Sequence, residues 1–139
     1  MSTSDFTLNP TLDKDTVEVV RLELCRVLLM RDKTYPWLIL VPATAGLRDL
    51  DDLGTLDRNQ VMAEVERVSK AMKAVFQPYK MNVATLGNVV EQLHIHVIAR
   101  FQDDPAWPAP VWGVHPPQDY DEAQRLEIIA KLRHALGVD

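Results

Sequence analysis

The sequence predicts an α+β domain in which a long helix packs on an antiparallel sheet of about five strands, with a second helix at the C-terminus. Three observations predict this class. Short apolar runs bounded by proline or turn residues recur along the chain, as is typical of strands. One long segment, residues 55–76, instead carries apolar residues at helical spacing. The length of 139 residues, 47% of them apolar, suits one domain, residues 1–139, with its own core.

The first part of the chain predicts a hairpin. Residues 1–16 are polar and predict a loosely held arm or one short turn. Between Val17 and Met30, apolar residues of one parity indicate a strand over the second half of the segment. A turn at residues 31–34 leads to Trp37–Val41, a continuous apolar run between two prolines. Such a run suits a strand that is buried on both faces and pairs with the strand before it.

The long helix should begin at Thr55 or Asp57, either of which can cap it, and should end at about Phe76, before Pro78. Its inward face is apolar and comprises Val61, Val65, Val68, Met72 and Val75. Its outward face is charged and comprises Glu64, Glu66, Arg67, Lys70 and Lys73.

The remaining segments predict two strands, a loop and a helix. Strands are expected at Met81–Ala84 and in the histidine-containing segment that starts at Gln92. Residues 102–119 are rich in proline and tryptophan and predict a structured loop, and residues 120–137 predict a helix that Gly137 ends. The apolar face of that helix comprises Leu126, Ile129, Leu132 and Leu136.

The composition excludes several classes of function. A formal net charge of −5 argues against a broad basic surface for a nucleic acid polymer. Cys25 is the single cysteine, so neither an intramolecular disulfide nor a cysteine-rich zinc site can form. No apolar run reaches the roughly 18 residues of a membrane span, and the N-terminus lacks the pattern of a signal peptide. We therefore expect a cytoplasmic protein that does not enter a membrane.

The residues with the clearest chemical potential are Gln92, His94 and His96. In a strand, side chains at positions i and i+2 share one face, so these three stand in a row. Leu93, Ile95 and Val97, the apolar residues next to them in sequence, then point into the core and pin the register of the strand. The two histidines are thus expected on a rigid element, as a catalytic group requires.

Three interpretations of this row remain open. The histidines can be structural and hydrogen-bonded to their neighbours. They can chelate zinc, although the remaining candidate ligands, among them His115, His134 and Cys25, do not stand at a recognisable metal spacing. They can also act in nucleophilic or acid–base catalysis, because a neutral imidazole is a competent nucleophile and two adjacent histidines disfavour each other's protonation.

The segment Gln92-Leu93-His94-Ile95-His96-Val97-Ile98 resembles the signature of the histidine triad (HIT) family, His-φ-His-φ-His-φ-φ with φ apolar, at every position but the first. The resemblance covers a core of about residues 20–101. Its other parts are Pro36–Pro42, similar to the second strand of the family, Leu50–Phe76, similar to its connector and long helix, and Gly87–Val90, similar to its phosphate-contacting loop.

The resemblance implies a hydrolase or nucleotidyl transferase that attacks the α-phosphate of a nucleotide of the diadenosine polyphosphate or nucleoside phosphoramidate type. The nucleophile of the family corresponds to His94, which would form a covalent nucleotidyl-histidine. His96 corresponds to the histidine that contacts the phosphate, and Gln92 takes the position of the first histidine. Phosphate contacts are also implied for Gly87, Asn88 and Asn82. The resemblance implies no metal or other cofactor. It does imply that the protein forms a homodimer.

Four positions depart from the family pattern. Gln92 and Trp37 each stand where histidine is common in the family. Met30 stands where asparagine is common, and Asn88 where glutamine is common. They keep open an alternative, a non-enzymatic nucleotide-binding or adaptor protein on the same fold.

Other residues have competing interpretations. Arg100 continues the parity of the histidines and either reaches a substrate phosphate or is solvated. Trp107 and Trp112 are expected to pin the loop or form an interface rather than contact a base. Cys25 is interpreted as a small buried hydrophobic residue, and His115 and His134 as surface residues.

Overall fold

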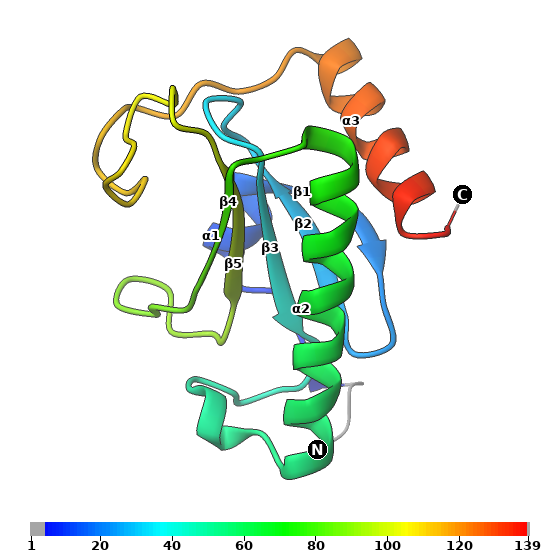
Figure 1. The fold of residues 1–139 in the computed structure, drawn as a ribbon. Helices are drawn as coiled ribbons and strands as arrows, with labels where there is room; N and C mark the ends of the chain where they lie inside the picture. The colour runs from blue at the N-terminus through cyan, green and yellow to red at the C-terminus, as the bar shows by residue number, and fades with distance from the viewer. Residues whose placement is uncertain (1–4, 139) are drawn as a thin grey trace.

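The computed structural model of the chain describes residues 5–138, which form one antiparallel sheet with helices on both of its faces (Figure 1). The sheet has the strand order β1-β2-β3-β5-β4. Its strands are β1 (Thr16–Arg21), β2 (Cys25–Met30), β3 (Trp37–Pro42), β4 (Lys80–Ala84) and β5 (Ile95–Arg100). The helices are α1 (Pro10–Asp15), α2 (Thr55–Phe76) and α3 (Glu122–Ala135), with a 3₁₀ turn, η2, at Leu50–Asp52. The predicted α+β fold with a five-stranded antiparallel sheet is confirmed.

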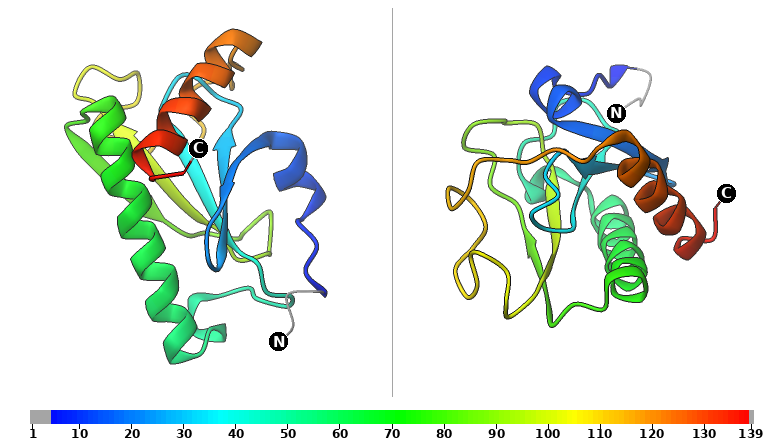
Figure 2. Two further views of the ribbon diagram at one scale, coloured as in Figure 1. Left: turned by 90° about the vertical axis from the view of Figure 1, so that its right-hand side faces the viewer. Right: turned by 90° about the horizontal axis from the view of Figure 1, so that it is seen from above.

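The two faces of the sheet carry separate cores. Helices α2 and α3 cover one face, and the short helix α1 lies on the other (Figure 2). The first core joins the apolar stripe of α2 to residues of β5 such as Ile95 and Val97. The second core joins Phe6 and Leu12 of the N-terminal segment to Ile39 of β3 and Ile98 of β5. Because strand side chains alternate between faces, β5 contributes to both cores at once.

Helix α2 matches its prediction in length but differs from it at the N-cap and in the placement of Glu64. It runs from Thr55 to Phe76, but Gly54 is its N-cap residue, and Gln77, with a φ of 53°, ends it just before Pro78. The placement of Glu64 on the solvent face was wrong, because this side chain is only 3% exposed. Its carboxylate accepts hydrogen bonds from the backbone amides of Leu24 and Cys25. The carboxylate therefore satisfies two donors beside the β1–β2 turn.

The N-terminal third of the chain is more ordered than its composition suggests. The segment 17–30 forms two strands of a hairpin, β1 and β2, where only the second was predicted. The β2–β3 hairpin is confirmed. Of the two alternatives predicted for residues 1–16, the loosely held arm was wrong for residues 5–16, because Phe6 and Leu12 are buried, and the short turn corresponds to helix α1, which Asn9 caps. Residues 1–4 lie outside the described part of the chain.

Helix α3 packs through fewer residues than predicted. Leu132 and Leu136 are buried and Ile129 lies against them, but Leu126 is 58% exposed, so its assignment to the inner face was wrong. Gly137 follows the helix with a φ of 77°, a conformation that glycine adopts without strain. Between residues 5 and 138, no helix has both the length and the apolar character that crossing a membrane requires.

Candidate active site

The two histidines lie on the face of the sheet opposite α2. His96 belongs to β5 and pairs with Ile39 of β3 and Ala84 of β4, while His94 immediately precedes the strand. Both side chains are 6% exposed, and their ring centroids are 5.0 Å apart. Because β3 and β4 flank β5 on both sides, the backbone that carries His96 is held on both edges.

Beside the histidines lies a pocket of about 390 Å³. Its wall on one side is helix α1, and on the other side it is the loop 86–90 that precedes the histidine segment. Met30, Ile39 and Trp112 complete the enclosure. The residues that line it are Thr11, Leu12, Asp15, Met30, Ile39, Leu86, Gly87, Asn88, Val89, Val90, His94, His96 and Trp112.

The geometry of His94 determines which of its ring nitrogens can react. Nδ1 lies 2.6 Å from the backbone carbonyl oxygen of Gln92. A carbonyl oxygen can only accept a hydrogen bond, so Nδ1 carries the ring proton and is the donor of this hydrogen bond. In the neutral ring, Nε2 then keeps its lone pair. His94 therefore combines a fixed orientation with an unprotonated nitrogen, the combination that a nucleophile needs.

His96 is held in the opposite tautomer. The indole Nε1–H of Trp37, which can only donate, lies 3.0 Å from Nδ1 of His96. Nδ1 is therefore an acceptor, and the proton of the neutral ring sits on Nε2. Burial, and next the proximity of His94, lower the pKa of His96 from 6.5 to about 4. With both rings neutral, the pair thus consists of a lone-pair nitrogen on His94 and an N–H donor on His96.

This depressed pKa predicts a pH dependence of stability. His96 is neutral when folded but takes up a proton near pH 6.5 when unfolded, so acidification from about pH 6.5 to 4 favours the unfolded chain. We expect up to about 3 kcal/mol of unfolding free energy to be lost across this window. Urea denaturation between pH 7.5 and 4 measures it. The His96→Gln variant should lose most of this slope, and an equal slope in the variant would contradict the assignment.

Gln92 has a different position from that expected of a catalytic group. Its side chain does not line the pocket. Its Oε1 accepts from the backbone amide of Asn9 at 2.8 Å, and its Nε2 donates to the backbone carbonyl of Thr7 at 2.9 Å. The contact of Gln92 with the histidine pair is made by its backbone carbonyl, which accepts the hydrogen bond from Nδ1 of His94.

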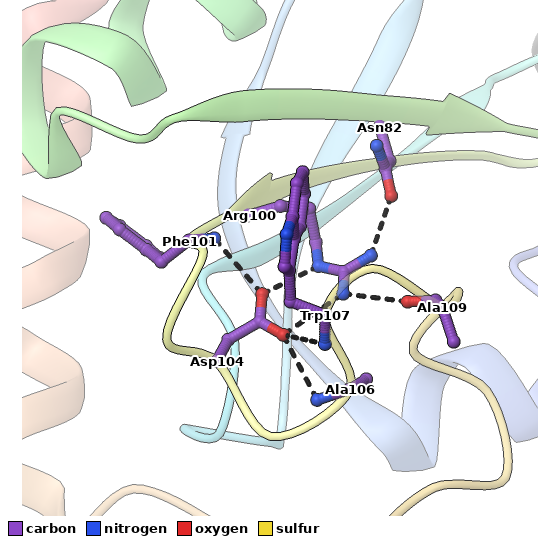
Figure 3. A network of polar contacts seen from close by, with 7 residues as sticks. All are labelled: Asn82, Arg100, Phe101, Asp104, Ala106, Trp107 and Ala109. Carbon is purple, nitrogen blue, oxygen red and sulfur yellow. Dashed lines mark hydrogen bonds and ion pairs between the residues drawn. The ribbon is translucent and has the colours of Figure 1, made fainter.

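Arg100 and Asn82 were expected to contact phosphate, but neither lines the pocket. The guanidinium of Arg100 forms an ion pair with Asp104, with Nε and Oδ2 2.8 Å apart, and also donates to Asn82 Oδ1 and to the carbonyl of Ala109 (Figure 3). The side chain is 1% exposed and lies beside the ring of Trp107. Arg100 thus organises the loop after β5 and is neither a pocket residue nor a solvated one.

Gly87 and Asn88 do line the pocket, as the loop before the histidines was expected to. Gly87 has a φ of 83°, in the left-handed region that favours glycine. A Cβ there would meet nothing nearer than 3.6 Å, so backbone conformation rather than space is the reason for glycine.

Sequence reasoning missed the contribution of the N-terminal segment. Thr11, Leu12 and Asp15 form a wall of the pocket, and no local pattern could indicate that α1 reaches the histidines. Trp112 was expected to be a pin or an interface residue. It also lines the pocket, and its ring lies 5.0 Å from that of His96 and 5.8 Å from that of Trp37.

The described part of the structure provides no set of ligands for the alternative of a zinc site. Within residues 5–138, no three histidine, cysteine or acidic side chains are grouped so that they could hold a metal ion. His115 and His134 are exposed. Cys25 is 1% exposed, and burial, followed by the nearby Glu64 carboxylate, raises the pKa of its thiol.

Comparison with solved structures identifies proteins that are similar to this chain in both sequence and fold. A histidine triad protein from Marinobacter aquaeolei VT8 is 45% identical, with a TM-score of 0.92 over 95% of this chain and 96% of its own. A histidine triad protein from Bradyrhizobium japonicum is 41% identical, also with a TM-score of 0.92, over 94% of this chain and 98% of its own.

Comparison with curated sequences gives a more distant relative, named AP-4-A phosphorylase, from Mycobacterium tuberculosis. It is 28% identical over 106 residues, which are 71% of this chain and 54% of the relative. The chain thus spans about half the length of this curated relative. The family model described as HIT domain matches residues 11–103, which include all of α1 but Pro10, both histidines and the whole sheet. The chain belongs to the histidine triad, or HIT, domain family.

Proposed function

We propose that the protein is a nucleotide hydrolase or nucleotidyl transferase that attacks the α-phosphate of its substrate with Nε2 of His94. The observation that carries the proposal is the opposite tautomers of the two histidines. The Gln92 carbonyl leaves the lone pair of His94 on Nε2, and the Trp37 indole leaves the proton of His96 on Nε2. Such a pair offers an attacking nitrogen and, beside it, a donor for a phosphate oxygen.

The reaction proceeds in two balanced steps. The lone pair of His94 Nε2 attacks phosphorus, and the bond from phosphorus to the leaving group breaks, with the electron pair departing on that group. The ring keeps its Nδ1 proton, so the nucleotidyl-imidazole carries a positive charge that the Gln92 carbonyl dipole stabilises. Water then attacks phosphorus, the P–N electron pair returns to Nε2, and a proton of the water passes to solvent. Another nucleophile in place of water gives transfer.

Neutral donors would bind the phosphate. None of the described residues that line the pocket is a lysine or arginine. Nε2–H of His96 would be one donor, and Gly87 and Asn88, which line the pocket in the loop before the histidines, would supply others. Because Asn82 and Arg100 are bonded to each other outside the pocket, they take no part in this proposal.

Trapping the covalent intermediate tests the proposal. The protein is mixed in separate samples with a diadenosine polyphosphate and with adenosine phosphoramidate, quenched rapidly in alkaline denaturant, and analysed by intact-mass spectrometry. We expect a gain of one adenylyl group, mapped to His94 by peptide sequencing and missing from His94→Ala. AMP binding without an adduct or turnover would instead support a non-enzymatic nucleotide-binding protein, the alternative that Gln92 favours because its side-chain amide carries no titratable proton.

The resemblance to the family also leads us to propose a homodimer. Light scattering coupled to size-exclusion chromatography measures the mass in solution, and a mass of 15.8 kDa, that of one chain, would contradict it.

A further inference from the structure

The side chain of Gln92 joins two segments that lie far apart in the sequence. Its Oε1 accepts from the amide of Asn9 at 2.8 Å, and its Nε2 donates to the carbonyl of Thr7 at 2.9 Å, across more than 80 positions of the chain. A primary amide carries both an acceptor and donors on one rigid group. It can therefore bond to a backbone amide and a backbone carbonyl of the same short segment at once, and it does so without a charge that changes with pH.

The segment bonded in this way leads directly into one wall of the pocket. Asn9 caps helix α1, with its Oδ1 accepting from the amide of Thr11 at 2.8 Å. Thr11, Leu12 and Asp15 of α1 then face the pocket. One hydrogen bond of Gln92 is thus made to Asn9, the residue that caps α1, and the other to Thr7, two positions before it. We call residues 6–15 the N-terminal arm.

A second attachment holds the arm from the other side. Phe6 and Leu12 are buried in the core cluster that contains Leu28 and Ile39 of the sheet. The guanidinium of Arg26 lies 4.7 Å from the centre of the Phe6 ring. Phe6 does not line the pocket, so a change at Phe6 can affect a ligand only indirectly, through the arm or through the core that it shares with Ile39.

Gln92 therefore connects to the site in two directions. Its backbone carbonyl orients the His94 ring, and its side chain holds the arm. We propose that Gln92 is a positioning residue whose side chain holds the N-terminal arm in place as a substrate-binding wall of the pocket, and that this side chain takes no part in the chemical step. The inference rests on the proposed function for the identity of the ligand, a nucleotide.

The arrangement predicts a separation of binding from chemistry. Gln92→Ala removes both side-chain hydrogen bonds to the arm and leaves the carbonyl that orients His94 in place. We expect hydrogen–deuterium exchange of the amides of residues 6–15 to accelerate, the dissociation constant for AMP to rise about tenfold, and the rate of adduct formation at saturating substrate to change less than threefold. Gln92→Glu, of nearly the same shape, keeps the acceptor for Asn9 but loses the donor to Thr7, so it should weaken AMP binding as well.

Two further variants make the test specific. Phe6→Ala loosens the arm without touching Gln92, and it should raise the AMP dissociation constant with the same small effect on the saturated rate. The double variant Gln92→Ala/Phe6→Ala should weaken binding by less than the product of the two single effects, because both act through one segment. Gln102→Ala, a change at an exposed glutamine just after β5, is the matched control and should equal wild type.

Each result decides between positioning and another role. A large loss of the saturated rate in Gln92→Ala with unchanged AMP binding would place Gln92 in the chemical step and overturn the inference. Unchanged exchange in the arm would overturn it too, and this measurement needs no nucleotide. If the wild-type protein does not bind AMP while Gln92→Ala still accelerates exchange in the arm, the proposed nucleotide function fails and the attachment of the arm stands.

Discussion

Replacing Asp104 with alanine is expected to lower the free energy of unfolding by about 3–5 kcal/mol. The loss arises because Arg100, 1% exposed, would be left as a buried charge without its partner. The Asp104 side chain, itself 5% exposed, also accepts hydrogen bonds from the backbone amides of Phe101, Ala106 and Trp107. Removing the carboxylate therefore leaves the Arg100 cation without its ion-pair partner and the amides of Phe101 and Ala106 without their acceptor, while the Trp107 amide keeps a longer hydrogen bond to the Asp104 backbone carbonyl (Figure 3).

The pKa of Asp104 indicates how strongly this environment favours the charged form. Burial alone would raise the pKa of this carboxyl, but the hydrogen bonds from Arg100 and from the amides of Phe101 and Trp107 outweigh it and lower the pKa to about 2. The stabilisation from Asp104 should therefore persist down to about pH 4 and disappear only as the pH falls from there towards 2. This window lies below that of His96, so the two contributions can be separated in one acid titration.

The neighbouring residue provides the control for this prediction. Asp103 is an exposed aspartate, and Asp103→Ala should change the unfolding free energy by less than about 0.5 kcal/mol. Urea denaturation at pH 7 measures both variants. The double variant Arg100→Met/Asp104→Leu, which removes both charges, should be more stable than Asp104→Ala alone. A loss below about 1 kcal/mol in Asp104→Ala would contradict the view that the ion pair organises this loop.

Alternation explains why part of the site could be predicted from the sequence. Leu93, Ile95 and Val97 are apolar and pack in the core on the α2 side, so the residues between them, His94 and His96, turn to the other side of the sheet, although the strand itself begins only at Ile95 and not at Gln92 as predicted. The same local reasoning gave α2, whose apolar residues recur at helical spacing over six turns. In both cases the information lies within a few residues of the element itself.

Contacts between distant segments could not be predicted in this way. Arg100 lies an even number of positions after His94 and His96, which suggested that it shares their face of the strand. Its partner Asp104 lies in the loop after the strand, and no periodic pattern in the sequence indicates that this loop turns back towards Arg100. Glu64 sits among charged residues of α2, and only the fold shows that its carboxylate meets the amide of Cys25. Likewise, the polar composition of the N-terminal arm concealed the two apolar residues, Phe6 and Leu12, that are enough to bury it.

His94→Ala should reduce turnover of an adenylyl substrate by at least about 10³-fold while the dissociation constant for AMP changes by less than tenfold. The reason is that no other described residue of the pocket offers an unprotonated imidazole nitrogen. His96, the one other histidine there, presents Nε2–H because the Trp37 indole occupies its Nδ1. His96→Ala should also slow turnover, but by less, since it removes a hydrogen-bond donor to phosphate and leaves the nucleophile.

Chemical rescue separates a nucleophilic role from a structural one. His94→Ala removes an imidazole from the edge of an open pocket, so added imidazole can enter and attack phosphorus in its place. We expect imidazole to restore part of the turnover of His94→Ala, with a rate that rises with its concentration, and to leave His96→Ala unchanged. The rescued reaction should release an adenylyl-imidazole and form no protein adduct. Turnover of His94→Ala close to wild type without imidazole would show that another group attacks phosphorus, because alanine cannot supply the electron pair.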